Sequence, residues 1–153
     1  MFESCAIVQF LADTLAPGTL APTPGPTKNR AEFEKWLWFG GLLMDQLLWQ
    51  IHGPGIMGLA AEERDPHVVM VVEKKWKDEI EPQLCAQLSA SARLGPFLLG
   101  EFSAVDCVVG HCVRWSRSYG LSAVPQLEAY IEACMQRTAF ADTFDSPATL
   151  PKL

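Results

Sequence analysis

The most constraining feature of the sequence is a capping motif that leads into a long apolar segment. Ser103 and Asp106 stand three residues apart, so the serine can accept from the N–H three residues on while the carboxylate reaches back to the serine N–H. A carboxylate in the first turn also meets the positive end of the helix dipole. The apolar residues that follow are Val105, Val108, Val109, Cys112 and Val113. The motif therefore predicts a helix that begins here and lies buried at the centre of the fold.

Apolar side chains recur at helical spacing in four further segments. They are residues 3–14, residues 28–51, a stretch of some twenty residues that begins at Pro66, and a last segment after Pro125. Asp65 before Pro66 fits an N-cap followed by proline in the first turn. Pro82 should kink or locally open the third of these helices. The sequence thus predicts an all-α fold with a core that 49% hydrophobic residues can fill.

The segment 28–51 carries two features beyond its core-facing stripe. Gly40 and Gly41 weaken a helix, so we expect a close backbone approach there. Trp38, Leu42 and Trp49 form a second apolar line on another side. That line indicates either a further buried surface, as a subunit contact or a ligand pocket, or a helix that is central to its own domain.

Composition and charge exclude several classes of partner. Eighteen acidic residues against 12 basic ones give the 153-residue chain a formal net charge of −6, which argues against nucleic-acid binding. No run of about 18 apolar residues occurs, so we expect no membrane span. The N-terminus lacks the basic region of a signal peptide, and five cysteines without a CxxC pair indicate reduced thiols. We therefore expect a cytoplasmic protein.

Four strings of residues resemble one known family. The segment 95–106, Gly-Pro-Phe-Leu-Leu-Gly-Glu-Phe-Ser-Ala-Val-Asp, resembles the turn and capping box of cytosolic glutathione transferases. The segments 124–130 and 137–140 are similar to the next helix of that family and to its Arg-Pro-Ala-Phe ending, with Thr138 in place of the proline. The segment 2–13 is similar to the last helix of the family's thioredoxin-like domain.

This resemblance implies a domain organisation for the whole chain. Residues 1–14 would be the last helix of a truncated thioredoxin-like domain, and residues 15–27, with four prolines, a linker. Residues 28–142 would form the helical bundle of a glutathione transferase C-terminal domain, and residues 143–153 a loosely ordered tail. The implied fold is therefore an all-α bundle preceded by one short helix.

The resemblance also implies site residues. Glu3 and Ser4 match the positions that hold the γ-glutamyl end of glutathione, and a helix start favours such a carboxylate; the alternative is that they only cap the first helix. Asp45, Trp49 and Gly53 fall where the family lines its pocket for the electrophile, with ordinary packing as the rival interpretation of Trp49. Glutathione is the implied substrate, and no metal is implied.

The family conjugates glutathione to hydrophobic electrophiles and is commonly a homodimer. Its thiol-activating Tyr, Ser or Cys lies near the start of the thioredoxin-like domain, upstream of the segment that Phe2 begins. The resemblance thus implies a transferase-like protein whose present chain binds glutathione weakly and conjugates little or nothing. The alternative is a non-catalytic protein–protein interaction module of the same helical type.

Other chemistry has little support in the sequence. Cys107 and His111 stand four apart and could share one side of a helix, with Cys112 adjacent, but a structural zinc site needs four ligands and no second cluster completes it. Ser, His and Asp occur without the Gly-x-Ser-x-Gly elbow of a hydrolase. We therefore expect neither a metal centre nor a hydrolytic triad.

Overall fold

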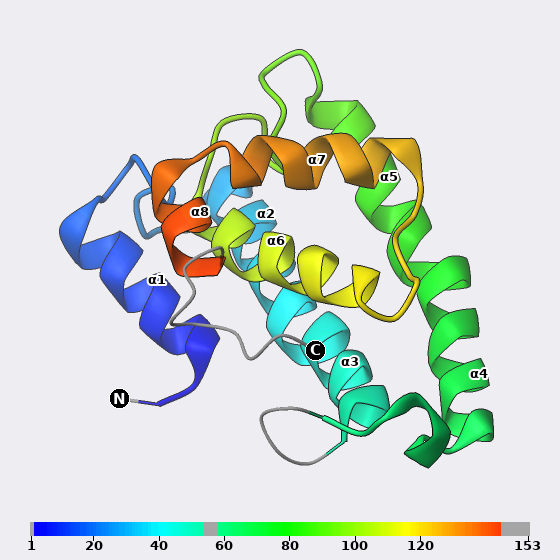
Figure 1. Ribbon diagram of the computed structural model, residues 1–153. Helices are drawn as coiled ribbons and strands as arrows, with labels where there is room; N and C mark the ends of the chain where they lie inside the picture. The colour runs from blue at the N-terminus through cyan, green and yellow to red at the C-terminus, as the bar shows by residue number, and fades with distance from the viewer. Residues whose placement is uncertain (1, 54–57, 145–153) are drawn as a thin grey trace.

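In the computed structural model, helix follows helix throughout the described residues, 2–53 and 58–144 (Figure 1). Within that part of the chain only isolated β-bridges occur, and the all-α class predicted from the sequence is confirmed. Residues 145–153 of the predicted tail lie outside the described residues. The α-helices are α1 (Ser4–Leu15), α2 (Lys28–Trp38), α3 (Asp45–His52), α4 (Pro66–Lys75), α5 (Glu81–Ser91), α6 (Ala104–Arg117), α7 (Pro125–Met135) and α8 (Thr138–Phe144).

Two of the predicted helices are long rods that each contain a π-helical segment. The first rod runs from α2 through Phe39–Met44 (η1) into α3, and the second from α4 through Trp76–Ile80 (η3) into α5. The second π segment ends two residues before Pro82. Because proline has no N–H to donate, the local opening predicted there takes the form of a π turn. A short 3-10 turn, Ala61–Glu63 (η2), precedes α4.

The ends of the rods are set by local hydrogen bonds. Thr27 accepts from the backbone N of Arg30 at 3.2 Å, which starts α2. Asp65 accepts from the backbone N atoms of His67 and Val68 at 2.8 and 3.4 Å, so α4 begins at the predicted N-cap. These caps satisfy N–H groups that have no partner within the helix itself.

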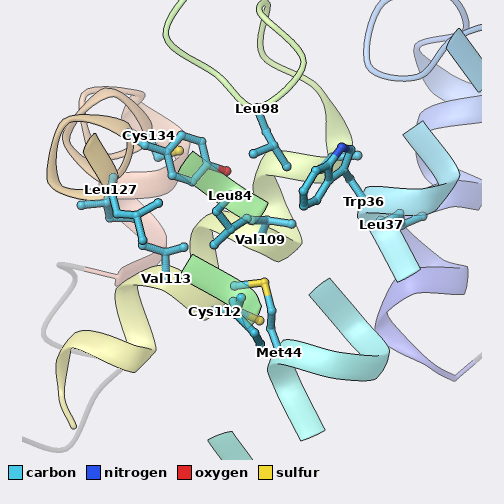
Figure 2. Close-up of a cluster of buried hydrophobic side chains, with 14 of the residues drawn as sticks. Trp36, Leu37, Met44, Leu84, Leu98, Val109, Cys112, Val113, Leu127 and Cys134 are labelled. Carbon is cyan, nitrogen blue, oxygen red and sulfur yellow. The ribbon is translucent and has the colours of Figure 1, made fainter. Parts of the chain in front are cut away.

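Helix α6 lies at the centre of the bundle, in contact with α1, the first rod and α7 (Figure 1). Val105, Val109 and Val113 are fully buried, and Cys112 is 1% exposed. Figure 2 shows Val109, Cys112 and Val113 among the buried side chains of the first rod, α5 and α7, which include Trp36, Leu37, Met44, Leu84, Leu127 and Cys134. The predicted buried central helix is confirmed, with Val108 only half-buried.

Asp106 joins the start of α6 to two neighbouring segments. Its Oδ2 accepts from the backbone N of Ser103 at 2.8 Å and from the Ser103 hydroxyl at 3.2 Å. Its Oδ1 accepts from the backbone N of Leu98 at 3.1 Å and from the Tyr130 hydroxyl at 2.9 Å. The predicted capping box forms, and it also fixes the 97–100 turn and α7 to α6.

The glycine pair of the first rod lies where two helices meet η1. A Cβ on Gly40 would stand 2.9 Å from a methyl carbon of Val108 in α6, and a Cβ on Gly41 would stand 2.2 Å from the sulfur of Cys5 in α1. The close approach expected at this pair is therefore confirmed. It allows α1 and α6 to pack on the same turn of the rod.

Arg30 fastens α1 to the first rod. Its buried guanidinium donates to both carboxylate oxygens of Asp13 at 2.6 and 2.9 Å, to Glu34 at 2.7 Å and to the carbonyl oxygen of Pro22 at 3.0 Å. The backbone N of Ala104 also donates to the carbonyl oxygen of Leu20 at 2.8 Å. The proline-rich segment and α1 are thus tied to the helical bundle.

Candidate functional site

Glu3 and Ser4 stand at the start of α1, and both side chains are exposed. Glu3 takes the N-cap position with φ 70°, a backbone conformation that is rare outside glycine, and its side chain forms no capping hydrogen bond. The two residues therefore present their polar groups to solvent at the positive end of a helix. The carboxylate of Glu3 also raises the pKa of Asp45, which places the two carboxyl groups within electrostatic reach.

Asp45 and Trp49 lie one turn apart on α3. Trp49 is 45% exposed, and Asp45 is half-buried. Desolvation raises the pKa of Asp45, while the nearby His111 and a hydrogen bond with Trp49 oppose that shift. Asp45 is thus within electrostatic reach of Glu3 and His111, one helical turn from Trp49.

Gly53 is the C-cap residue of α3 and is partly exposed. Its φ is 74°, and a Cβ there would stand 2.4 Å from the side chain of Leu59. The position requires glycine for the turn and for the close packing of the following loop. The structure therefore brings Asp45 and Trp49 together on one helix and puts Gly53 at its C-terminal end.

Trp49 belongs to an aromatic cluster that we call the α3–α6 seam. The seam consists of Trp49, His52, His111, Trp115 and Tyr119. The Trp49 ring lies 5.1 Å from His52 and 5.2 Å from Trp115, and His52 lies 5.1 Å from Trp115, all edge to face. His111 stacks on Trp115 at 5.8 Å with an interplanar angle of 26°. Edge-to-face and stacked pairs at these separations are attractive.

The seam ends in a hydrogen-bonded imidazole. Nδ1 of the buried His52 pairs with the hydroxyl of Tyr119, and the guanidinium of Arg64 lies 4.7 Å from the centroid of the Tyr119 ring. Burial raises the pKa of Tyr119, and desolvation lowers that of His111. Trp49, Trp115 and Tyr119 thus leave part of their aromatic surface in water, with the guanidinium of Arg64 against the ring of Tyr119.

Comparison with solved structures identifies the architecture. BphK, described as a bacterial glutathione transferase in a ternary complex, superposes with a TM-score of 0.75 at 23% identity, over 93% of this chain and 66% of that one. The fold is the helical bundle of a glutathione transferase. A beta-class glutathione S-transferase of Sphingomonas chungbukensis gives a TM-score of 0.71 at 23% identity, over 92% of this chain and 65% of that one.

A third glutathione S-transferase, from Xylella fastidiosa, gives a TM-score of 0.63 at 21% identity and covers 98% of this chain and 71% of its own. The present chain thus spans about two thirds of the length of the glutathione transferases that it matches. No protein-family model matches the sequence, and no curated protein matches it. The likeness to glutathione transferases is accordingly one of fold.

The thiols of this glutathione transferase fold are not activated. Burial raises the pKa of Cys112 and raises that of Cys134 to about 12, and it also raises the pKa of Cys5 and Cys85. A raised thiol pKa leaves little thiolate at neutral pH, so these four cysteines are poor nucleophiles. In the described ranges no three His, Cys, Asp or Glu side chains come together as metal ligands, and none of the helices there is long and apolar enough to cross a membrane.

A separate groove lies between the first rod and α5. Its volume is about 300 Å³, and its lining residues are Lys35, Trp36, Phe39, Gln83, Ala86 and Gln87. It contains none of the predicted site residues. The α3–α6 seam, in contrast, includes Trp49 directly and touches Asp45.

Sequence reasoning did not single out His52, Trp115, Tyr119 or Arg64 as members of the site. A signal for two of them exists in the sequence, because Trp115 and Tyr119 follow His111 at successive steps of four. Such spacing puts all three side chains on one face of a helix. Arg64 carries no comparable signal, since it reaches the seam from a loop.

Proposed function

We propose that this chain is the helical part of a glutathione-transferase-like protein and that the α3–α6 seam forms one wall of its site for an aromatic co-substrate. The single observation that carries the proposal is the half-exposed Trp49–Trp115 pair. In this proposal Glu3 and Ser4 bind the γ-glutamyl end of glutathione. The chain covers 66% of BphK, and conjugation would also require the part of such a transferase that this chain does not cover.

Support for the glutathione end comes from α1. The exposed carboxylate of Glu3 can pair with the glutamyl ammonium, and the first-turn N–H groups near Ser4 suit the glutamyl carboxylate. The strained backbone at Glu3 agrees with a functional role, because strain of this kind persists where a site needs it. The carboxylate of Glu3 is also within electrostatic reach of Asp45, which precedes Trp49 by one turn of α3.

The solvent exposure of Trp49 and Trp115 supports the proposed site for the aromatic co-substrate. Trp49 is 45% exposed although its ring touches two others, and Trp115 is half-buried. An indole pair that keeps one side in water can stack a planar ligand and gain the attraction of aromatic pairs. An apolar wall beside a polar cradle is the usual composition of a small-molecule site.

The test is a calorimetric titration of the chain with glutathione and with S-benzylglutathione, which adds one aromatic ring. We expect S-benzylglutathione to bind more tightly, and Trp49→Ala to weaken it by about tenfold because a stacked ring contributes up to about 1.5 kcal/mol. Glu3→Gln should weaken the binding of both ligands to the same extent. These results would separate the aromatic end from the glutamyl end.

Trp38→Ala is the matched control, because Trp38 lies on the same rod and is 40% exposed but is outside the seam. It should leave both affinities unchanged. The proposal fails if Trp49→Ala and Trp38→Ala have the same effect, or if the benzyl group adds no affinity.

A second candidate function is a non-catalytic interaction module, and the outer face of α1 favours it. Phe10 is 51% exposed, Leu11 45% and Leu15 75%, so three large apolar side chains face solvent together. Light scattering after size exclusion tests it: a homodimer that Phe10→Glu dissociates, in a chain that does not bind S-benzylglutathione, would favour this candidate over the first.

A further inference from the structure

The groove between the first rod and α5 has a buried hydrogen-bond donor in its lining, the indole N–H of Trp36. The Trp36 side chain is 4% exposed. Its Nε1 is shut off from solvent, and no acceptor within residues 2–53 and 58–144 reaches it. The indole of Trp76 shows the ordinary arrangement, because its Nε1 donates to the hydroxyl of Ser122 at 2.9 Å. A buried N–H without a partner costs free energy, and a ligand that supplies an acceptor would remove this cost.

The opposite wall of the groove presents an acceptor. Gln87 of α5 donates from Nε2 to the carbonyl oxygen of Leu98 at 3.0 Å, which fixes the orientation of its carboxamide. Its Oε1 receives no hydrogen bond from the part of the chain that the structure describes. Trp36 comes from the first rod, so a donor and an acceptor that do not bind each other line one groove from its two sides.

The lining of the groove favours a neutral ligand over an anion. Among its six residues the only cation is Lys35, and Nζ of Lys35 is paired with the carboxylate of Glu32. Phe39 and Ala86 add apolar surface. An apolar lining with a few polar groups, in a volume of about 300 Å³, is the usual composition of a site for a small molecule.

Lys35 also controls access to the buried donor. Its Nζ lies 4.9 Å from the centroid of the Trp36 ring, so its side chain covers the indole. That side chain is 51% exposed and has a flexible stem, which allows it to move aside for a ligand.

We propose that this groove binds small neutral secondary amides. In a trans amide the carbonyl oxygen and the N–H point in opposite directions, so one group can accept from Nε1 of Trp36 on one wall and donate to Oε1 of Gln87 on the other. The alkyl ends of the ligand would contact Phe39 and Ala86. A carboxylate has acceptors only and leaves Gln87 without a donor. The site shares no residue with the α3–α6 seam and does not depend on the proposed function.

The experiment titrates the intact ¹⁵N-labelled chain with N-butylacetamide and with N-butyl-N-methylacetamide, which lacks the N–H. We expect the indole N–H signal of Trp36 to move downfield as it gains an acceptor, while that of Trp49 stays in place. The N-methyl compound should bind about fivefold more weakly, as the loss of one hydrogen bond predicts. Hexanoate, an anion of similar size, should also bind more weakly than N-butylacetamide.

Substitutions assign the two hydrogen bonds to their residues. Gln87→Met removes the acceptor and should bring the two amides to equal affinity. Gln126→Met is the matched control, because Nε2 of Gln126 also donates to a backbone carbonyl oxygen, that of Cys85, but lies outside the groove. It should keep the preference for the secondary amide. Trp36→Phe removes the indole N–H and should weaken both amides by about fivefold, as the backbone signals of α5 would report.

The comparison of ligands on the unmodified chain tests the proposal even where a variant fails to fold. Equal affinity for the two amides, tighter binding of hexanoate, or a Trp36 signal that does not move would each contradict it. A preference for the secondary amide that survives Gln87→Met would show that another acceptor selects it, and the assignment to Gln87 would be wrong. None of these results bears on Trp49 and Trp115, so the proposed function would stand or fall separately.

Discussion

At the start of α6, Asp106 is fully buried and accepts four hydrogen bonds; near its end, Trp115 and Tyr119 keep part of their surface in water. Both regions lie on one helix and both gather side chains from other helices. The first gives four donors one buried acceptor, whereas the second leaves part of each aromatic ring exposed to solvent. The start of α6 thus contributes to the stability of the fold, whereas the end of α6 offers a surface for binding.

The sharpest way to break this comparison is to remove the carboxylate of the buried region. Asp106→Ala should lower the free energy of unfolding by about 4 kcal/mol, because two backbone N–H groups, a serine and a tyrosine hydroxyl lose their acceptor in the core. Urea unfolding followed by circular dichroism measures it. Asp106→Asn, which keeps one acceptor oxygen, should lose less. A loss below about 1 kcal/mol for the alanine variant would contradict a structural role.

Arg30 extends the comparison to α1. Arg30→Met should lower the free energy of unfolding by about 3 kcal/mol, because it leaves the carboxylate of Asp13 poorly solvated and unpaired. Hydrogen exchange should become faster in α1 than in α6. Arg117→Met is the matched control: Arg117 and Glu128 are both exposed, so its loss should cost less than about 0.5 kcal/mol. Equal losses for the two variants would show that burial of the ion pair is irrelevant.

The smallest effect concerns the carboxylate of Asp45, one turn before Trp49 on α3. Desolvation raises the folded-state pKa of Asp45, so between its ordinary pKa and the raised one the folded chain holds more protons than the unfolded chain. Stability should therefore fall as pH rises through that window. Asp45→Asn should remove this fall and make the chain slightly more stable at neutral pH, as urea unfolding at several pH values would show. A loss of stability at neutral pH would mean that Asp45 forms a stabilising ion pair.

The capping motifs and the glycine pair were predictable from the sequence because each depends on residues that are close together in the chain. The box at Ser103 and Asp106 and the N-cap at Asp65 depend on residues three apart, so their geometry follows from spacing alone. The glycine pair at positions 40 and 41 indicated a close approach for the same reason, since only the missing side chains had to be noticed.

Contacts between distant segments explain what the sequence did not reveal. Tyr130 reaches Asp106 across 24 positions, and the pairing of Trp49 with Trp115 depends on how α3 packs on α6. The π segment Phe39–Met44 shifts the register of the first rod before α3 begins, and an average helical period contains no sign of it. The pairing of the α3 rings with the α6 rings thus depended on packing rather than on spacing.

The most direct test of the seam as a binding surface is a titration of the chain with S-benzylglutathione, followed in ¹H–¹⁵N spectra. The five tryptophans give five indole N–H signals to follow. We expect the signals of Trp49 and Trp115 to move, while that of Trp76, which donates to Ser122 in the core, stays in place. Movement of Trp36 in the groove beside α5, with Trp49 and Trp115 unmoved, would contradict the account.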